Sequence, residues 1–564
     1  MNKYTCRSAV PGANRGEDAA PTVSIQDLNV ESRMNRLVYG TLRITLPVLL
    51  AGLTACTTLG PDFETPAAAI EAQWLERDNQ TLQTSAAVNS EWWTLFNDPV
   101  LDALVQQAYE QNLSLQIAGL RILEARAQLG IAIGSQYPQL QELAGSMSRV
   151  NLSENSPNFS SAADENYWTA NAGFNASWEL DFWGQFRRGV ESASANLGTQ
   201  IASYDNALVL LTADVASIYI QIRTLEEQLA VARSNVETQE KGYQLAEIKF
   251  RAGDTSGLDP AQAMTQLRNT QAQIPTLQSQ LRQSLHALSI LLGMPPRDLG
   301  ELLGESAIPE APAEIAIGAP AELLRRRPDI RQAELQAAAQ SAQIGVAEAA
   351  LYPSFSLLGS IGYTSSDTNR SEISDTFKSD SLGYSFGPSF SWPILNYGQL
   401  KNNVRVQDAR LEEAVINYQN TVLEAAREVE DGLAGFIGAK SAATYLSDSV
   451  KSAQQAVDLS MIQYREGATG FQRVLDSQQQ LLVQQDQYTS AKGNIVLNLV
   501  TTYKALGGGW QIRSGKAFVP EARQQQMRER TDWGELLPGE MLPEDLPAVP
   551  APAGDQPLFN KPDW

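Results

Sequence analysis

The chain has 564 residues, of which 43% are hydrophobic and 19% are charged, and its formal net charge at pH 7 is −22. This acidic balance argues against nucleic-acid binding, because contact with phosphates needs a basic patch. It permits an acidic, water-filled interior that favours cations, and it equally permits an acidic surface that only keeps the protein soluble.

Residues able to do chemistry are few. The chain has one histidine, His286, and two cysteines, Cys6 and Cys56, whose spacing fits neither a disulfide framework nor a metal site. Zinc sites and Ser-His-Asp triads need histidine together with partners, and the sequence has no phosphate-binding or dinucleotide-binding glycine motif. We therefore expect no enzyme activity, no catalytic residue, no metal site and no cofactor.

Residues 34–56 have the pattern of a secretion signal. Arg36 and Arg43 give a basic start, and residues 44–55 form an apolar run that is too short to span a bilayer. The run ends in Leu-Thr-Ala-Cys, which resembles a bacterial lipobox. The resemblance implies that Cys56 carries a covalent lipid and becomes the first residue of the mature protein. The alternative is an ordinary core segment.

The position of the signal sets where the fold begins. Thr57, not aspartate, follows the cysteine, and by resemblance to sorted lipoproteins this indicates the outer membrane. Residues 1–33 are polar and irregular, and we interpret them as a leader upstream of a true start at Met34. Residues 1–55 are excluded from the fold, and acyl chains on Cys56 would hold one end of the protein stably on the membrane.

The sequence carries the same unit twice, in one register, with Ala342 lying 215 residues after Ala127. Matching segments include 127–132 with 342–347, 137–138 with 352–353, 177–178 with 391–392, 184–185 with 398–399, 250–253 with 464–467, 258–259 with 475–476, and 292–293 with 506–507. We therefore divide the chain into a signal with its leader (1–55), an N-terminal segment (56–97), repeat one (98–300), a linker (301–315), repeat two (316–510) and an extended tail rich in proline and acidic residues (511–564).

Alternation of apolar and polar residues predicts two strands in each repeat. Residues 167–181, 355–363 and 382–394 alternate clearly, and residues 139–151 are assigned as the fourth strand from their place in the repeat. Strands of about ten residues with one apolar face suit a membrane barrel. A half-buried soluble sheet alternates in the same way.

Heptad patterns predict long helices. Residues 185–247 contain no proline, and apolar residues recur there every seven positions, as they do in the returning helix and in repeat two. The recurring residues are Leu208, Val215, Ile222, Leu229 and Val236 with Leu211, Ile218, Leu225 and Ala232; then Leu267, Ile274, Leu281 and Leu288; then Val422, Val429, Phe436, Ala443, Val450 and Val457. A helix of about 60 residues reaches about 90 Å. Pro275 should bend the returning helix.

The strand count requires association of chains. Closed membrane barrels begin at about eight strands, and an open sheet edge in lipid leaves backbone groups unpaired, at several kcal/mol each. Two chains would supply about eight strands and three would supply about twelve, and periodicity does not choose between these.

Several motifs stand out: Glu-Trp-Trp at 91–93, Phe-Asn-Asp-Pro-Val-Leu-Asp at 96–102, Leu-Arg-Arg-Arg-Pro-Asp-Ile at 324–330, the Tyr-Pro pairs at 137–138 and 352–353, and Gly253 and Gly467. Together they resemble the TolC-like outer membrane factors, in the lipoprotein branch called NodT-type, over residues 56–510. The resemblance implies a mainly α fold with a small β part. Three chains would form a twelve-stranded transmembrane barrel that continues as an internally duplicated, long-helix coiled-coil barrel. We expect the arginine-rich motif to mark a structural helix start.

The resemblance also implies a function without chemistry. The homotrimer would be the passive, gated outer-membrane channel of a tripartite efflux pump, exporting drugs or other small toxic compounds. Its partners would be a periplasmic adaptor protein, an inner-membrane pump and outer-membrane lipid, and the protein would extend into the periplasm.

The resemblance places the gate and the docking sites at the periplasmic tips. Asp476 would ring the closed aperture, where carboxylates from three chains repel one another and offer a cation site. Arg473 stands where some relatives carry aspartate, and it could attract Asp476 instead. Gly253, Gly467 and Asp259 would mark the tips that the adaptor reads. The alternatives are a solvated helix start for Asp476 and plain helix caps for the glycines.

Other functions remain open from the sequence. A protein-secretion component of the outer membrane uses the same fold. A structural coiled-coil lipoprotein without a pore would lack the four strands. A hydrolase is disfavoured by the scarcity of histidine and the absence of nucleophile motifs.

Overall fold

The computed structural model describes residues 58–83, 89–155, 164–312, 314–320, 326–368 and 371–537. Cys56 and the predicted signal lie outside the described residues, as do the end of the tail and Arg325 of the arginine-rich motif. The described residues fall within one unit of the chain, Thr57–Trp564.

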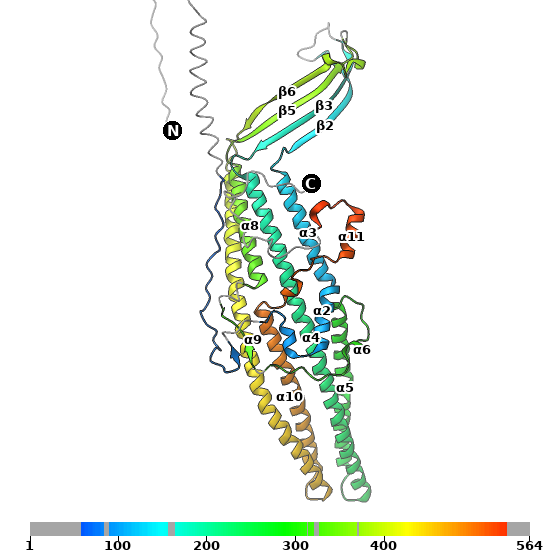
Figure 1. Cartoon of the computed structure of the whole chain (residues 1–564). Helices are drawn as coiled ribbons and strands as arrows, with labels where there is room; N and C mark the ends of the chain where they lie inside the picture. Colours follow the sequence, from blue (N-terminus) through cyan, green and yellow to red (C-terminus); the bar gives the residue numbers. More distant parts are fainter. Residues whose placement is uncertain are drawn as a thin grey trace, which may run out of the picture. The chain divides into compact units, whose positions relative to one another are not determined.

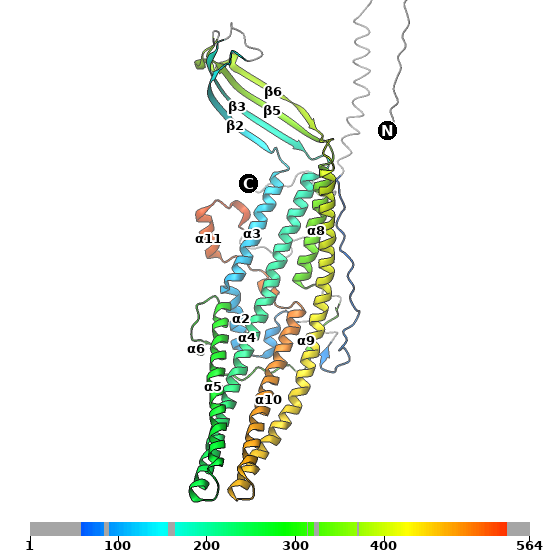
Figure 2. The ribbon, with the colours of Figure 1, turned by 180° about the vertical axis from the view of Figure 1, so that it is seen from behind.

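Two long helical hairpins dominate the fold (Figure 1). Helix α4 (Gln185–Ala252) returns as α5 (Leu258–Leu291), and α9 (Gln399–Arg465) returns as α10 (Phe471–Ala505). The shorter helices α3 (Leu113–Gly134) and α8 (Pro328–Ala349) run beside α4, and Figure 2 shows the same arrangement from behind.

Most of the heptad residues lie where the pattern predicts, in the core, and the others, such as Val236 and Ile274, are half-buried. Leu208, Val215 and Ile222 have no exposed surface, and Val429 and Phe436 are at most 1% exposed. An apolar stretch of α4 is long enough to span a bilayer, but 67% of it is buried within the protein, so α4 is a core helix. Helix α5 continues through Pro275.

Four strands form one antiparallel sheet with the order β2-β3-β5-β6. They are β2 (Leu140–Asn151), β3 (Asn166–Leu180), β5 (Ser354–Ser366) and β6 (Leu382–Ser391). All four predicted strands are therefore present, including the one assigned only from the repeat. Strands β3 and β5, which come from different repeats, pair at the centre, and β2 and β6 are the edges. The loop from β5 to β6 contains the short helices η2 (Ile373–Asp375) and η3 (Ser379–Ser381).

Short elements outside the long hairpins pack against the middle of the hairpins. They are β1 (Leu82–Gln83), which pairs in parallel with β4 (Ile315–Ala316), η1 (Trp92–Phe96), α2 (Pro99–Gln111) and α6 (Gly300–Leu303). Trp92 is fully buried and stacks on Tyr503, with ring centroids 5.8 Å apart. Asp98 caps α2 and accepts a hydrogen bond of 2.5 Å from the Tyr219 hydroxyl. The tryptophan motif is thus an anchor of the core.

The arginine-rich motif has the structural role expected from the sequence. Arg327 precedes α8, is 7% exposed, and donates to the carbonyl of Ala505 at 2.6 Å. Its guanidinium also pairs with Asp329 at 2.7 Å and with Glu428 at 2.9 Å. Arg327 therefore ties the start of α8 to α9 and to the end of α10.

The sequence predicts an extended tail, but the described part of the tail is not extended throughout. It contains η4 (Trp510–Arg513), η5 (Gly534–Leu536) and a helix, α11 (Glu521–Arg530). Residues 521–530 are mostly strong helix formers, Glu, Ala, Arg, Gln and Met, which follow Pro520. Composition alone hid this helix because acid and proline dominate the rest of the tail.

Candidate functional site: a two-faced sheet and two helical tips

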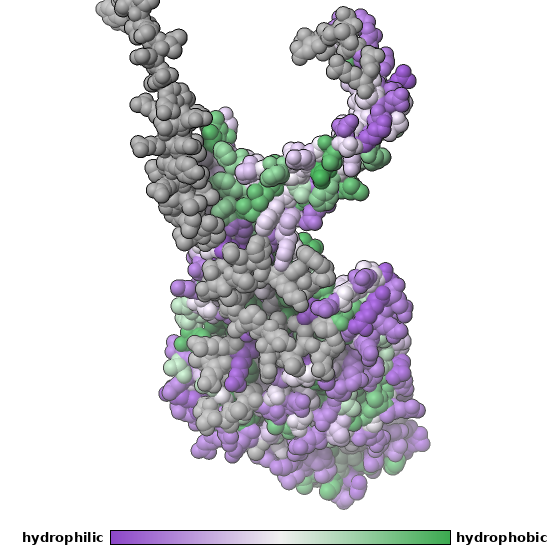
Figure 3. All heavy atoms as spheres, turned by 45° about the horizontal axis from the view of Figure 1, so that its top comes forward, coloured by the Kyte–Doolittle hydropathy of each residue, from purple (hydrophilic) through white to green (hydrophobic). Residues whose placement is uncertain are grey.

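The sheet has one apolar face and one polar face. Strand register places Leu143, Phe174, Ile361 and Tyr384 in one row across the four strands, and these side chains are 43% to 84% exposed. In Figure 3 hydrophobic residues gather on the sheet close to its junction with the helices. A sheet in water buries its apolar face, whereas a strand in a membrane turns it to lipid. The exposed apolar row therefore favours a membrane location.

The neighbouring row on the opposite face is polar. It consists of Glu142, Asn175, Ser360 and Ser385. The Asn175 amide donates to Glu142 at 3.1 Å, and the Ser360 and Ser385 hydroxyls lie 2.9 Å apart. These groups can be wetted by water or satisfied by one another, as the wall of an aqueous lumen requires.

Tryptophans mark the junction between sheet and helices. Trp178, Trp183 and Trp392 each donate their indole N–H to a backbone carbonyl, at 3.2, 2.8 and 3.0 Å. The Trp183 ring also contacts Tyr352, with centroids 4.8 Å apart. Indoles with an apolar body and one satisfied polar group are enriched where membrane meets water. The junction is thus suited to the membrane surface.

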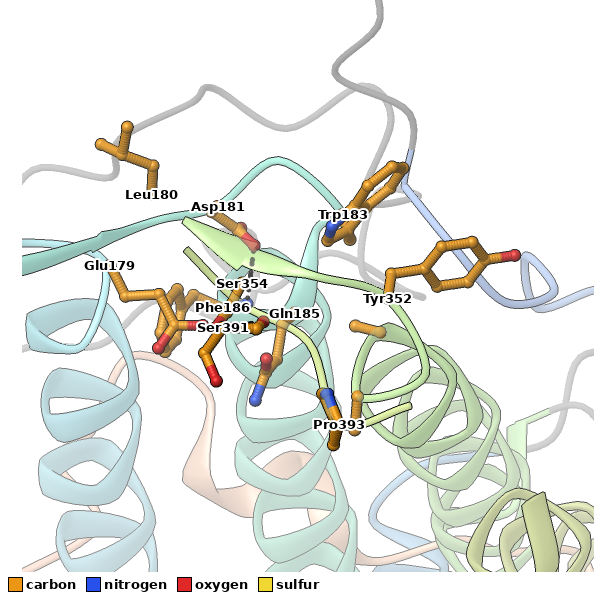
Figure 4. Close-up of a pocket in the computed structure, with 12 residues that line it drawn as sticks. Glu179, Leu180, Asp181, Trp183, Gln185, Phe186, Tyr352, Ser354, Ser391 and Pro393 are labelled. Atoms are coloured by element: carbon orange, nitrogen blue, oxygen red, sulfur yellow. Dashed lines mark hydrogen bonds between the residues drawn. The ribbon is translucent and has the colours of Figure 1, made fainter. Parts of the chain in front are cut away.

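A cavity of about 250 Å³ lies at the same junction, lined by residues that include Glu179, Asp181, Trp183 and Tyr352 (Figure 4). The Asp181 carboxylate accepts hydrogen bonds from the backbone N–H groups of Phe186 at 3.2 Å and Arg187 at 3.0 Å. It therefore caps the first turn of α4, where a carboxylate complements the unpaired N–H groups. The role of Asp181 is to fix the turn from β3 into α4.

Both hairpin tips turn on glycine. Gly253 and Gly467 have φ values of +83° and +74°, which side chains with a Cβ rarely adopt. The next residue in each tip closes the turn, with Asp254 N–H donating to Lys249 at 2.9 Å and Ala468 N–H donating to Gln463 at 2.8 Å. Nothing lies within 4 Å of a Cβ built at either glycine, so both turns leave room for a partner.

A hydrogen bond joins the two tips. The Tyr464 hydroxyl at the end of α9 donates to Asp259 at the start of α5, at 3.0 Å. Tyr464 is 3% exposed and packs edge-on against Phe471, with centroids 5.0 Å apart. Burial, helped by the bond to Asp259, raises the pKa of Tyr464, so the phenol stays a donor at neutral pH. We call this contact the tip latch.

The predicted gate residues lie together on one helix. Asp476 and Arg473 are both exposed, one helical turn apart near the start of α10. Asp476 accepts from Gln472 at 2.8 Å and not from Arg473 within the described residues. Neither side chain packs in the core of its own chain, so both can contact other chains.

Sequence reasoning did not single out Tyr464. A signal was present, because Phe250 occupies the matching position of repeat one, so the tyrosine adds a hydroxyl to an equivalent aromatic ring. Phe250 is 48% exposed, whereas Tyr464 is buried. A polar atom gained at a buried position predicts a partner.

Residues 104–294 and 319–508 match the family described as outer membrane efflux protein. The chain belongs to this family. It is 32% identical over 472 residues to Nodulation protein T of Rhizobium leguminosarum bv. viciae, covering 83% of this chain and 94% of that protein. It is 33% identical over 477 residues to the pyoverdine export outer membrane protein OpmQ of Pseudomonas aeruginosa, covering 82% and 97%. It is 30% identical over 480 residues to the probable outer membrane lipoprotein SilC of Salmonella typhimurium, covering 83% and 98%.

Solved structures of outer-membrane channels share this fold. The channel OprN superimposes with a TM-score of 0.74 at 31% identity, covering 80% of this chain and 99% of that one. CusC superimposes with a TM-score of 0.68 at 28% identity, covering 80% and 100%. The predicted family and the predicted fold class are therefore confirmed. The chain is therefore a channel component for efflux. It is located in the outer membrane.

Proposed function

We propose that three copies of this chain form the outer-membrane channel of a tripartite pump that exports drugs or other small toxic compounds. The observation that carries the proposal is the four-stranded sheet, with an exposed apolar face, a polar face and two edges. Joining β6 of one copy to β2 of the next gives about twelve strands with no edge in lipid. The polar row of Glu142, Asn175, Ser360 and Ser385 then lines the lumen.

The hairpins continue the conduit into the periplasm. The tips at Gly253 and Gly467 are open to a periplasmic adaptor protein, and Asp259 is the polar residue beside the first of them. An inner-membrane pump supplies the energy, and the channel conducts passively. Relatives named for export of pyoverdine or solvents support small compounds as cargo.

The closed gate rests on two features of the tips. Asp476 carboxylates from three copies approach one another at the aperture, and Arg473 on the same face supplies the opposite charge to a neighbouring copy. The tip latch between Tyr464 and Asp259 holds the second hairpin against the first. Opening separates the tips and breaks both sets of contacts.

The N-terminal part of the proposal is a lipid anchor on Cys56, consistent with a relative that is named a lipoprotein. The proposed divisions of the chain are the signal with its leader (1–55), the flanking segment (56–97), the repeats (98–300 and 316–510) with their linker (301–315), and the tail (511–564).

Conductance across planar lipid bilayers tests the channel and its gate together. Wild-type protein should give discrete, mostly closed channels. Asp476→Ala should raise the resting conductance several-fold, because it removes the carboxylate that Arg473 of a neighbouring copy attracts when the gate is closed. The matched control is Asp448→Ala, which removes an exposed charge on α9 away from the tip. It should behave as wild type. Absence of conductance would refute the channel, and an unchanged leak in Asp476→Ala would remove Asp476 from the gate.

A further inference from the structure

We propose that α4 and α8 hold the residues directly after Cys56 in a fixed seat, which we call the N-terminal clamp. It consists of residues 58–62 as the held segment, with Arg188 and Gly345 as the holding residues. The clamp determines where the lipid enters the membrane relative to the barrel. The lipid itself rests on the proposed modification of Cys56.

Arg188 is a buried cation that binds main chain. It is 1% exposed, and its guanidinium donates to the carbonyls of Leu59 at 2.9 Å and Gly60 at 3.0 Å. It also pairs with Asp62 and Glu191, both at 2.8 Å. A buried guanidinium is tolerated only when its donors are satisfied and its charge is paired. Without the held segment, Arg188 would lose hydrogen-bond acceptors for its buried guanidinium, and without Arg188 the segment would lose the group that holds its carbonyls.

Glycines allow the segment to approach the helices. A Cβ at Gly345 would lie 2.4 Å from the Leu59 carbonyl oxygen. Gly60 has a φ of +85°, and a Cβ there would lie 2.5 Å from the Gly345 Cα. Contacts this short exclude any side chain at either position. The backbone of the held segment therefore lies directly against the backbone of α8.

The internal repeat shows that this contact is made by repeat two and not by the matching glycine of repeat one. Gly345 and Gly130 occupy the same place in the duplicated motif at 342–347 and 127–132. A Cβ at Gly130 would meet nothing within 4 Å. Of these two glycines, Gly345 alone contacts the N-terminal segment.

The seat lies at the junction of sheet and helices. The Leu59 N–H donates to the carbonyl of Trp183 at 3.1 Å, and Trp183 belongs to the junction described above. One residue, Thr57, separates Cys56 from Thr58, which limits the distance between their Cα atoms to about 7 Å. Acyl chains on Cys56 therefore enter the membrane beside the base of the sheet.

The segment stays attached beyond the seat. Phe63 packs against Ala195 of α4 and Ala338 and Ala339 of α8. The Thr65 hydroxyl donates to Glu334 at 2.7 Å. A pull on the lipid is thus carried directly by α4 and α8.

Hydrogen exchange of the full-length protein in lipid nanodiscs tests the clamp. The peptide that contains Leu59 should exchange slowly in the wild type. Arg188→Met and Gly345→Ala should each speed its exchange about tenfold or more, because they remove charged hydrogen bonds or displace the segment. Gly130→Ala is the matched control and should leave this peptide unchanged. Protection of α10 peptides verifies in each variant that the fold is intact.

The same peptide reports the lipid through its mass. Rapid exchange of the wild-type peptide, or no change in both clamp variants, would overturn the clamp. A lipid-free Cys56 with a slowly exchanging Leu59 peptide would instead overturn the anchor and the clamp's role in placing it. Channel conductance, measured separately, distinguishes either result from failure of the proposed channel function.

Discussion

At the scale of single residues, one of two equivalent aromatic rings carries a hydroxyl group that links the two tips. Tyr464 and Phe250 occupy equivalent places in the repeats, but only Tyr464 is buried and reaches Asp259. The partners are 205 residues apart. Neither pattern nor spacing within a repeat brings them together, and only the packing of hairpin on hairpin does so.

Removing this hydroxyl should loosen the closed state. Tyr464→Phe keeps the ring in its apolar cluster but loses a hydrogen bond to a carboxylate, worth about 1–2 kcal/mol. The resting leak in planar bilayers should rise about 5- to 30-fold. Tyr445→Phe changes a tyrosine that is 76% exposed on α9 and should change nothing. Equal leaks in wild type and Tyr464→Phe would contradict the latch.

The latch also has a predicted pH dependence. Burial raises the pKa of Tyr464 above the usual tyrosine value of about 10. A raised folded-state pKa means that the stabilisation is present below the unfolded value and is lost as pH rises through the folded one. The Tyr464→Phe effect should therefore persist up to about pH 10. An effect that vanished between neutral pH and pH 9 would contradict this assignment.

A second residue-scale prediction concerns the tail. Arg513 and Asp205 form a buried ion pair, with Nη2 and Oδ2 2.8 Å apart. Burial raises the pKa of Asp205, and Arg513 opposes the rise. Arg513→Met should cost about 3–5 kcal/mol by leaving the carboxylate unpaired. The carboxyl's folded pKa then rises further, so the loss should grow as pH rises from 5 to 8.

Thermal unfolding at the two pH values measures this effect. Arg523→Met, an exposed arginine on α11, is the control and should leave the unfolding temperature within a degree or two of wild type. A loss in Arg513→Met that is the same at both pH values would show that Asp205 is not left as an unpaired buried charge.

At the scale of elements, local periodicity predicted most of the fold. Seven-residue spacing located α4, α5 and α9, and alternation located β3, β5 and β6, because each pattern follows directly from the geometry of its element. Strand β2 was assigned only from the repeat, since polar and small residues weaken its alternation, and pairing with β3 supplies its register. Helix α11 was missed because the composition of the whole tail outweighed ten helix-forming residues. Arg188 was missed because its partners in the N-terminal segment are 126 to 129 residues away.

The two faces of β6 give a prediction from adjacent residues. Phe386 is 86% exposed on the apolar face, and Ser385 belongs to the polar row. Phe386→Arg places a charge in lipid and should cost about 2–4 kcal/mol. Ser385→Arg places the same charge in the lumen and should be tolerated. The fraction of protein recovered as heat-resistant oligomer in membranes measures the difference, and equal recovery of both variants would refute the assignment of faces.

At the scale of the whole molecule, the duplication and the supply of only four barrel strands by each chain together explain the assembly. Each repeat supplies a hairpin and two strands, and the central β3–β5 pair joins the repeats into one sheet. The sheet still ends in two edges, β2 and β6. Within lipid, each unpaired backbone group on such an edge costs several kcal/mol. Closure through other copies removes that cost, and it also surrounds the polar rows with a continuous wall.

The mass of the purified protein in lipid nanodiscs tests this closure most directly. Native mass spectrometry should find three copies in each particle, and the same preparation should conduct ions in bilayers. A particle with a single copy, water-soluble without lipid or detergent, would contradict shared closure of the barrel.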